Sequence, residues 1–211
     1  MVILEILGFN KDTYSEVIVT TSCNGKVNAA PIGVRMFNDR TLYFKIYRPS
    51  TTYEYIACSR ECVLNITSNP RLFYTSIFDK EKLKFKRSFR VSPPRIIGAN
   101  GYVECKVSSV EDFEEYSIVY CNPVHVEYES QPPKAFNRAE PAIIEALIHY
   151  SRIIPFVRKG WCNEVKHLLE RIEFCRYIVE HSTCNSELLE MMDGIRVKAY
   201  EASATCLEDN R

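Results

Sequence analysis

A compact group of residues suited to binding an anion lies between positions 48 and 52. Arg48 is followed closely by three hydroxyl side chains, those of Ser50, Thr51 and Thr52. An arginine makes charge-assisted hydrogen bonds to oxyanions, and the free N–H groups of a helix N-terminus add further donors. Because the group stands where a strand gives way to a helix, we expect it to bind a phosphate. Thr51 and Thr52 also suit a purely structural role as helix caps, which is the commoner use of such residues.

The segments around this group predict the elements that position it. Residues 42–47 (LYFKIY) have the composition of a strand, and residues 51–60 have the apolar spacing of an amphipathic helix. The predicted apolar face comprises Tyr53, Ile56 and Ala57. Residues 61–67 (ECVLNIT) return to strand. Asn65 is unusual in this apolar run, since a buried amide needs partners, and its alternative role is to cap a neighbouring turn.

The first two thirds of the chain are rich in predicted strands separated by turn signals. A hairpin is expected around Asn24-Gly25. The predicted strands are 16–21, 27–34, 42–47, 61–67, 101–108 and 117–129. This pattern predicts an α+β fold that is mainly antiparallel β, as a closed or nearly closed barrel. Residues 80–90 are basic and carry interleaved aromatics, so an edge strand, a solvated loop and a lid over a ligand all remain open.

The composition changes after Pro132-Pro133, and the last third of the chain is predicted to be helical. Asn137 is expected to cap the first helix and Pro155 to end it. Its predicted stripe is Ile143, Ile144, Leu147 and Ile148; the next helix has Val165, Leu168, Leu169, Ile172 and Cys175. We therefore expect two domains, a barrel at 1–132 and a helical region at 133–211 packed on the barrel.

Three sequence segments together resemble a known superfamily. They are residues 27–34 (VNAAPIGV), the pattern Arg48-x-Ser50-x-Thr52, and residues 63–67 (VLNIT). In this order they resemble the FMN-binding split barrels of the flavin reductase-like branch. The helical tail narrows the resemblance to a largely archaeal, uncharacterised group of small flavoproteins within that superfamily.

The resemblance implies a six-stranded Greek-key split barrel that forms a homodimer, with FMN in a groove at the dimer interface. It places small residues of one strand along the flavin ring, hydroxyl residues and an arginine at the phosphate, and the end of a third strand near the ribityl chain. The implied cofactor-binding residues are Asn28, Ala30, Pro31, Ile32, Gly33, Tyr47, Arg48, Ser50, Thr51, Thr52, Asn65 and Thr67.

The implied activity is that of a flavin reductase-like oxidoreductase linked to NAD(P)H. An FMN-binding electron carrier without turnover is the alternative, and another phosphorylated or haem-type ligand is a third. In such an oxidoreductase the flavin supplies the redox chemistry while the polypeptide binds, orients and shields it. No catalytic side chain can be assigned from the sequence.

Composition limits the other classes of function. Lysine plus arginine and aspartate plus glutamate number 27 each, so net charge favours neither nucleic acid nor an anionic membrane as a partner. The N-terminal segment lacks the flanks of a signal peptide. Nine cysteines without secretory context predict a reduced, cytoplasmic protein. Cys58 and Cys62 are expected to be buried small hydrophobes rather than metal ligands.

Overall fold

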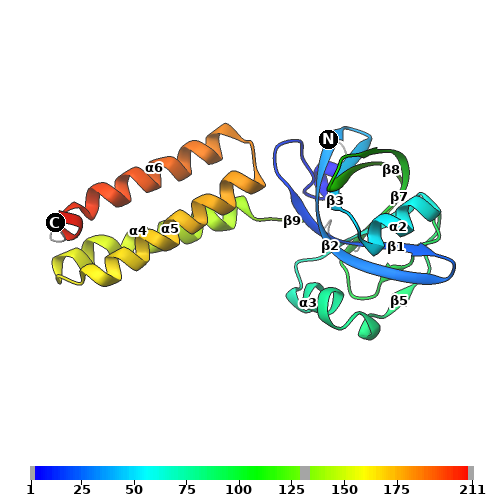
Figure 1. Ribbon diagram of the computed structural model, residues 1–211, viewed down its shortest axis with the longest axis horizontal. Coiled ribbons are helices and arrows are strands. Elements are labelled where there is room, and N and C mark those ends of the chain that lie inside the picture. The colour runs from blue at the N-terminus through cyan, green and yellow to red at the C-terminus, as the bar shows by residue number, and fades with distance from the viewer. Residues whose placement is uncertain (1–2, 129–133, 209–211) are drawn as a thin grey trace. The chain divides into compact units, whose positions relative to one another are not determined.

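The computed structural model describes residues 3–128 and 134–208 of the chain. Two compact units are present, Met1–Phe136 and Asn137–Arg211. Figure 1 shows that the first unit consists mostly of strands and the second of helices. The expected strand end at residue 129 and the expected domain boundary after residue 132 both lie outside the described residues.

Six long strands of the first unit form a closed antiparallel barrel. Their spatial order is β1-β2-β3-β8-β7-β4, and β4 pairs again with β1 to close the ring. The strands are β1 (Ser15–Cys23), β2 (Lys26–Asn38), β3 (Thr41–Tyr47), β4 (Glu61–Ile66), β7 (Gly101–Asp112) and β8 (Tyr116–Tyr128). A seventh, short strand, β9 (Phe136–Asn137), is added beside β1. The predicted six-stranded antiparallel barrel is confirmed, and β1 and β2 form the predicted hairpin around Asn24-Gly25.

The barrel interior is filled from the strands and from the N-terminal segment. Along β2 the alternate residues Ile32, Val34 and Met36 are buried in the core, which is the period-two pattern of a strand with one apolar face. Helix α1 (Ile3–Ile6) and the residues after it contribute Leu4 and Phe9 to the same core. Burial of these apolar side chains is the main stabilising contribution to the barrel.

Residues 69–100 contain a helix that the sequence pattern did not predict. Helix α3 (Pro70–Phe78) is capped by Asn69, whose side chain accepts a hydrogen bond from the N–H of Arg71. It is followed by the 3₁₀-helix η1 (Lys80–Lys82) and by a two-stranded sheet of β5 (Phe85–Lys86) and β6 (Arg95–Ile96). The basic run at 80–90 therefore contains one 3₁₀ turn and one two-residue strand, and its other residues lie in neither helix nor strand.

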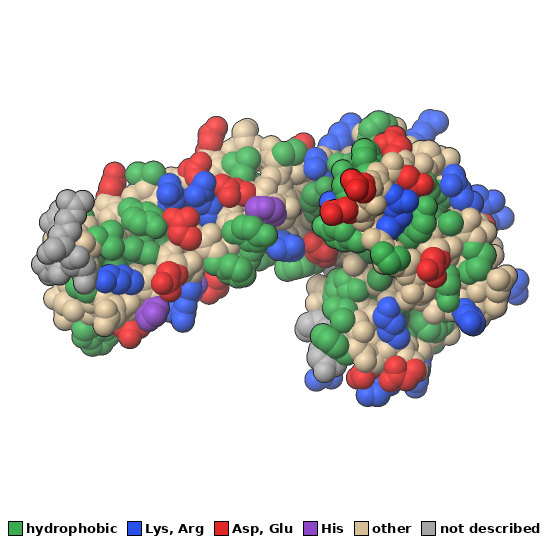
Figure 2. Space-filling view, in the orientation of Figure 1, with side chains coloured by type: hydrophobic (Ala, Val, Ile, Leu, Met, Phe, Trp, Pro, Cys, Tyr) green, Lys and Arg blue, Asp and Glu red, His purple; other side chains and the backbone are tan. Residues whose placement is uncertain are grey.

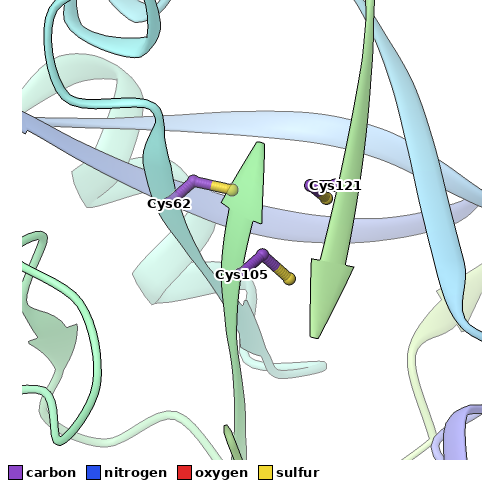
Figure 3. A group of neighbouring side chains, drawn as sticks. All are labelled: Cys62, Cys105 and Cys121. Atoms are coloured by element: carbon purple, nitrogen blue, oxygen red, sulfur yellow. The ribbon is translucent and has the colours of Figure 1, made fainter. Parts of the chain in front are cut away.

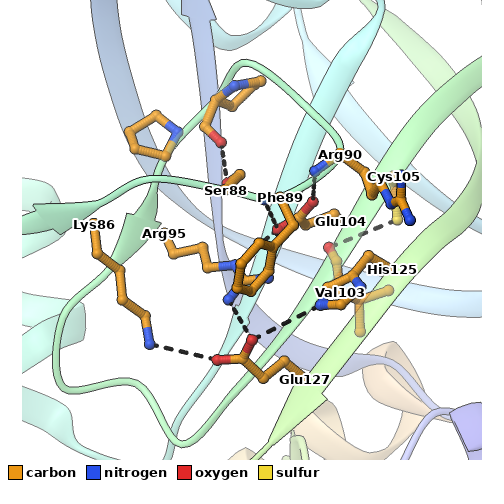
Figure 4. A network of polar contacts seen from close by, with 12 residues as sticks. Lys86, Ser88, Phe89, Arg90, Arg95, Val103, Glu104, Cys105, His125 and Glu127 are labelled. Carbon is orange, nitrogen blue, oxygen red and sulfur yellow. Dashed lines mark hydrogen bonds and ion pairs between the residues drawn. The ribbon is translucent and has the colours of Figure 1, made fainter.

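A buried ion-pair network fixes the loop between β5 and β6. The Nη2 of Arg95 lies 2.6 Å from Oε1 of Glu104, and both side chains are fully buried. Glu104 also accepts hydrogen bonds from the N–H groups of Phe89 and Arg90, at 2.8 and 2.6 Å. Glu127 binds the other side of Arg95 at 2.7 Å, and Figure 4 shows these groups converging. A carboxylate with this many donors anchors a loop firmly to the barrel wall.

The second unit consists of helices α4 (Ala139–Arg158), α5 (Cys162–Ser182), α6 (Ser186–Ala202) and α7 (Ala204–Glu208). The predicted stripe of α5 is confirmed, because all five of its residues are buried. Pro155 does not end α4, which continues to Arg158. The predicted stripe of α4 is partly wrong: Leu147 and Ile148 are 48% and 40% exposed. The side chain of Ile144 lies outside the described part of the chain. Ile143 is buried as predicted, and the helix also buries Ala142, Ala146 and Ile153.

Two disulfides correct the expectation that the cysteines are reduced. Cys23 in the β1–β2 hairpin is bonded to Cys58 of helix α2 (Thr51–Ser59), and Cys162 is bonded to Cys206 in the helical unit. Cys58 is exposed, so it is not the buried hydrophobe that we predicted. The partners are 35 and 44 residues apart, and nothing local in the sequence indicates such pairings.

Charged side chains of both signs are interspersed on the face of each unit seen in Figure 2. Among the described residues, every helix is too short or too polar to cross a lipid bilayer.

Candidate functional site

The predicted strand-to-helix junction is present. Strand β3 ends at Tyr47 and helix α2 begins at Thr51. Ser50 is the N-cap, and its hydroxyl oxygen accepts a hydrogen bond of 3.3 Å from the N–H of Tyr53. The cap satisfies one of the four N–H groups that a helix start leaves without helical partners. The predicted apolar face of this helix is corrected in one position, because Ile56 is buried and Tyr53 half-buried while Ala57 is exposed.

Arg48 lies beside the start of α2, where it contacts Asp112 and Tyr53. Its Nη1 lies 3.8 Å from Oδ1 of Asp112, at the end of β7, and its guanidinium lies over the Tyr53 ring at 5.3 Å. The Nε atom is buried and has no hydrogen-bond partner among the described residues. A buried donor without an acceptor is costly. The position is therefore suited to an anionic group that accepts from Nε.

Asn28 links the barrel to the first turn of α2 and to the segment after α3. Its Nδ2 donates to Oγ1 of Thr52 at 3.0 Å, and its Oδ1 accepts from Nζ of Lys80 at 2.8 Å. Asn28 and Thr52 are buried, whereas Thr51 is exposed. Lys80 thus brings a second cation to the site. Sequence reasoning missed this residue, although it noted the basic run that Lys80 begins.

The stretch of β2 expected to follow the flavin has one open backbone side. In the strand pairings of the described residues, residues 28–33 pair with β1, while pairing with β3 begins only at Val34. Ala30 and Pro31 are half-buried, and the side chain of Ile32 faces the core. The unpaired side therefore offers backbone groups to a ligand or a second chain.

Gly33 lies under a side chain of the same protein. A Cβ at this position would lie 3.3 Å from Cδ1 of Tyr14, which is tight. Its small size is thus explained by packing within the barrel.

Asn65 has a structural role, but it links strands rather than capping a neighbouring turn as the alternative interpretation predicted. The side chain is fully buried, and its Nδ2 donates to the carbonyl of Ile18 at 2.8 Å. Its Oδ1 accepts from the N–H of Ile96 at 2.7 Å. The amide therefore ties β4 to β1 and β6. Thr67 is also buried and its hydroxyl accepts from the N–H of Asn69.

Tyr47 points outward at the end of β3. Its side chain is 66% exposed, and Nζ of Lys45 lies 4.7 Å from its ring centroid. The structure therefore gathers Asn28, Arg48, Ser50, Thr51 and Thr52 at one place and adds Lys80, whereas Asn65 and Thr67 use their polar groups within the fold.

Three cysteine thiols lie close together inside the barrel. Cys62, Cys105 and Cys121 are buried on β4, β7 and β8, and their sulfur atoms all lie within 4.8 Å of one another (Figure 3). Cys62 is buried as predicted. No sequence pattern indicated the cluster, because three different strands supply one thiol each.

Comparison with known proteins places both units in one family. A family model described as "Protein of unknown function (DUF447) N-terminal domain" matches residues 15–130, and a second described as "Protein of unknown function (DUF447)" matches residues 137–196. The uncharacterized protein MJ1453 of Methanocaldococcus jannaschii is 24% identical over 151 residues, covering 66% of this chain and 74% of its own.

Two solved structures share the fold. The crystal structure of the FMN-bound protein MM1853 from Methanosarcina mazei has a TM-score of 0.53 at 21% identity, covering 94% of this chain and 99% of its own. The structure of the flavin reductase HpaC complexed with NADP+ has a TM-score of 0.50 at 21% identity. The match covers 64% of this chain and 88% of the HpaC chain. Since the N-terminal family model alone matches more than half of the sequence, the chain belongs to the DUF447 family.

Proposed function

We propose that this protein binds FMN at the start of α2 and acts as a flavin reductase-like oxidoreductase that accepts hydride from NAD(P)H. The observation that carries the proposal is the buried Nε of Arg48, a charged donor beside a helix N-terminus with no acceptor among the described residues. The fold shared with an FMN-bound protein and with a flavin reductase supports the choice of ligand.

The phosphate end of FMN fits the donors at the junction of β3 and α2. Arg48 offers a charged N–H, and the N-terminus of α2 offers backbone N–H groups and a favourable dipole. The hydroxyl of Thr51, which is exposed, adds a neutral donor. Thr52 and Asn28 would position this end through their mutual hydrogen bond.

The ring end of FMN would lie along the open backbone side of β2. Backbone N–H and C=O groups of residues 28–33 match the polar edge of an isoalloxazine, and the small side chain of Ala30 allows close approach. Bound FMN would supply the hydride and electron chemistry, and the polypeptide would orient and shield it.

A homodimer is part of the proposal. Tyr47 is 66% exposed beside the proposed phosphate site, and Phe113 is 43% exposed and stacks on Tyr116 with ring centroids 4.8 Å apart. Exposed aromatic side chains of this kind are enriched at protein interfaces. Sedimentation equilibrium of the purified full chain would give the mass of a dimer, and a monomer at micromolar concentration would contradict this part.

Titration of the purified chain with FMN tests the cofactor. Binding should quench flavin fluorescence with a stoichiometry of one FMN per chain, and no uptake at micromolar FMN would overturn the proposal. Extraction of any bound chromophore from freshly purified protein tests the alternative of a haem-type or other phosphorylated ligand.

Anaerobic stopped-flow mixing of the FMN complex with NADH and with NADPH tests the reaction separately. Rapid bleaching of the flavin absorbance supports the oxidoreductase. A complex that binds FMN tightly but is reduced by neither nucleotide would instead be an electron carrier.

A further inference from the structure

The three thiols inside the barrel are arranged around one point. Figure 3 shows the side chains of Cys62, Cys105 and Cys121 projecting toward a common space from three neighbouring strands. Cys62 and Cys105 are directly paired across β4 and β7, and Cys121 is paired with Val107 across β7 and β8. All three sulfur atoms lie within 4.8 Å of one another.

The spacing fits three sulfur ligands of one small centre. Bonds from sulfur to thiophilic metal ions are about 2.3 Å long, so three sulfurs around one ion lie roughly 3.4–4.0 Å apart, depending on the bond angles. A small inward rotation of the side chains reaches this spacing. Thiolates select soft ions over magnesium, calcium and manganese.

The surroundings restrict the charge of the ion. The thiols belong to the apolar core that also contains Leu64, Val103 and Val119, all fully buried. Over the described ranges 3–128 and 134–208, no histidine or carboxylate joins the group as a fourth ligand. Three thiolates around a monovalent ion would have a net charge of −2, and around a divalent ion a net charge of −1. Burying either charge in an apolar core is costly. Three thiolates around a trivalent centre have no net charge.

We propose that Cys62, Cys105 and Cys121 form a three-sulfur binding site for a trivalent thiophilic centre of the arsenite class. Neutral arsenous acid would exchange its three hydroxyl groups for three sulfurs. Three As–O bonds break, three As–S bonds form, and each thiol proton leaves with a hydroxyl as water. Arsenic remains trivalent, and no net charge enters or leaves the core.

The barrel wall beside the thiols offers a route for a small neutral solute. The β7–β8 register shifts between Glu104 and Cys105 and again between Val107 and Ser109. Cys105 is also paired with Pro123, which has no N–H to donate to the ladder. Both bulges and a proline weaken a strand pairing. Local opening is therefore expected at this seam, and binding should be slow.

Arsenite uptake by the full chain tests the proposal. The experiment uses a background with Cys175→Ala and Cys184→Ser, which removes the other two reduced cysteines, and protein purified without reductant so that both disulfides remain. After long incubation and gel filtration, arsenic should be retained at one atom per chain with loss of three titratable thiols. X-ray absorption should show three As–S bonds and no As–O bond.

Single variants of the site separate it from adventitious thiol chemistry. Cys62→Ala, Cys105→Ala and Cys121→Ala should each weaken arsenite binding by at least roughly 10–100-fold, the loss that even outer partners of a metal site produce. Circular dichroism would verify that each variant is folded. Restoring Cys175 to the background is the matched control, because this cysteine is also buried but lies in the helical unit; it should leave the affinity unchanged.

The arsenite experiment is independent of FMN binding, so its outcome does not depend on the proposed flavin site. Arsenic that is not retained by the folded chain, or that is retained equally by all three site variants, would overturn the proposal. Retention of zinc with no retention of arsenite would overturn it as well, because the neutral core would then accept a net charge.

Discussion

Nζ of Lys80 donates a hydrogen bond of 2.8 Å to Oδ1 of Asn28, across 52 positions of sequence. Asn28 in turn donates to Thr52 in the first turn of α2. The contact joins the basic segment after α3 to the proposed phosphate site. It gives that site a second cation and links the start of the segment to the barrel.

Replacing Lys80 with methionine should weaken FMN binding about tenfold or more. A charge-assisted contact contributes roughly 1.5–3 kcal/mol, and each 1.4 kcal/mol is about tenfold in Kd. Fluorescence titration with FMN measures the effect. Lys82→Met is the matched control, since Lys82 is two residues away and pairs with Asp79 at 2.9 Å. If both variants lost the same FMN affinity, Lys80 would not be a specific part of the phosphate site.

Replacing Arg48 with alanine should weaken FMN far more than riboflavin. The proposed contact of Arg48 is to the phosphate, which riboflavin lacks, and its loss should cost roughly 1.5–3 kcal/mol. Parallel titrations with both flavins measure the difference. Arg40→Ala, in the exposed β2–β3 turn, should change neither affinity. If riboflavin and FMN were weakened alike, Arg48 would act on something other than the phosphate.

Replacing Glu104 with glutamine should destabilise the barrel by about 3–5 kcal/mol, because it leaves the buried guanidinium of Arg95 with one carboxylate partner, Glu127. Urea unfolding at neutral pH measures the loss. Glu127→Gln should cost less, since the Glu127 side chain is 36% exposed and the Glu104 side chain is fully buried. The reverse order would contradict the assignment of Glu104 as the central anion.

The same network predicts sensitivity to acid. Burial raises the pKa of Glu104, but hydrogen bonds from the Phe89 and Arg90 amides and from Arg95 outweigh it, so the pKa lies below the ordinary 4.5. Arg95 likewise lowers the pKa of Glu127. The unfolded chain therefore binds these protons first, and stability falls as the pH drops below about 4.5. Wild-type protein should lose more stability between pH 5 and pH 3 than the Glu104→Gln variant. If the stabilities of the two proteins fell equally between pH 5 and pH 3, protonation of Glu104 would not account for the loss.

Replacing Cys23 and Cys58 together with serine should lower the free energy of unfolding by roughly 2–4 kcal/mol, since the bond closes a loop across 35 positions. Thermal unfolding measures the change. The pair Cys162→Ser and Cys206→Ser is the control, because that disulfide lies in the helical unit. It should leave the unfolding of the barrel and its FMN affinity unaltered. If the variant without Cys23 and Cys58 were as stable as the wild type, the Cys23–Cys58 disulfide would not stabilise the barrel.

The sequence by itself determined the local elements of this protein. Strand-type composition bounded by turn signals predicted the barrel strands, the Asn24-Gly25 turn predicted the hairpin, and the hydroxyl cluster at Ser50 predicted where α2 begins. These features depend on neighbours within a few positions, which is why pattern and turn chemistry suffice to find them. The proposed phosphate site could be located for the same reason.

Tertiary structure alone decided which distant residues share an environment. Asn65 is satisfied by β1 and β6, Lys80 reaches Asn28, and Cys23 meets Cys58, each through contacts more than thirty positions apart. The exposed side of α4 and the three-thiol cluster likewise depend on which surfaces pack together. No local pattern encodes such pairings, because they follow from strand order and barrel closure, which bring the interior faces of β4, β7 and β8 around one point.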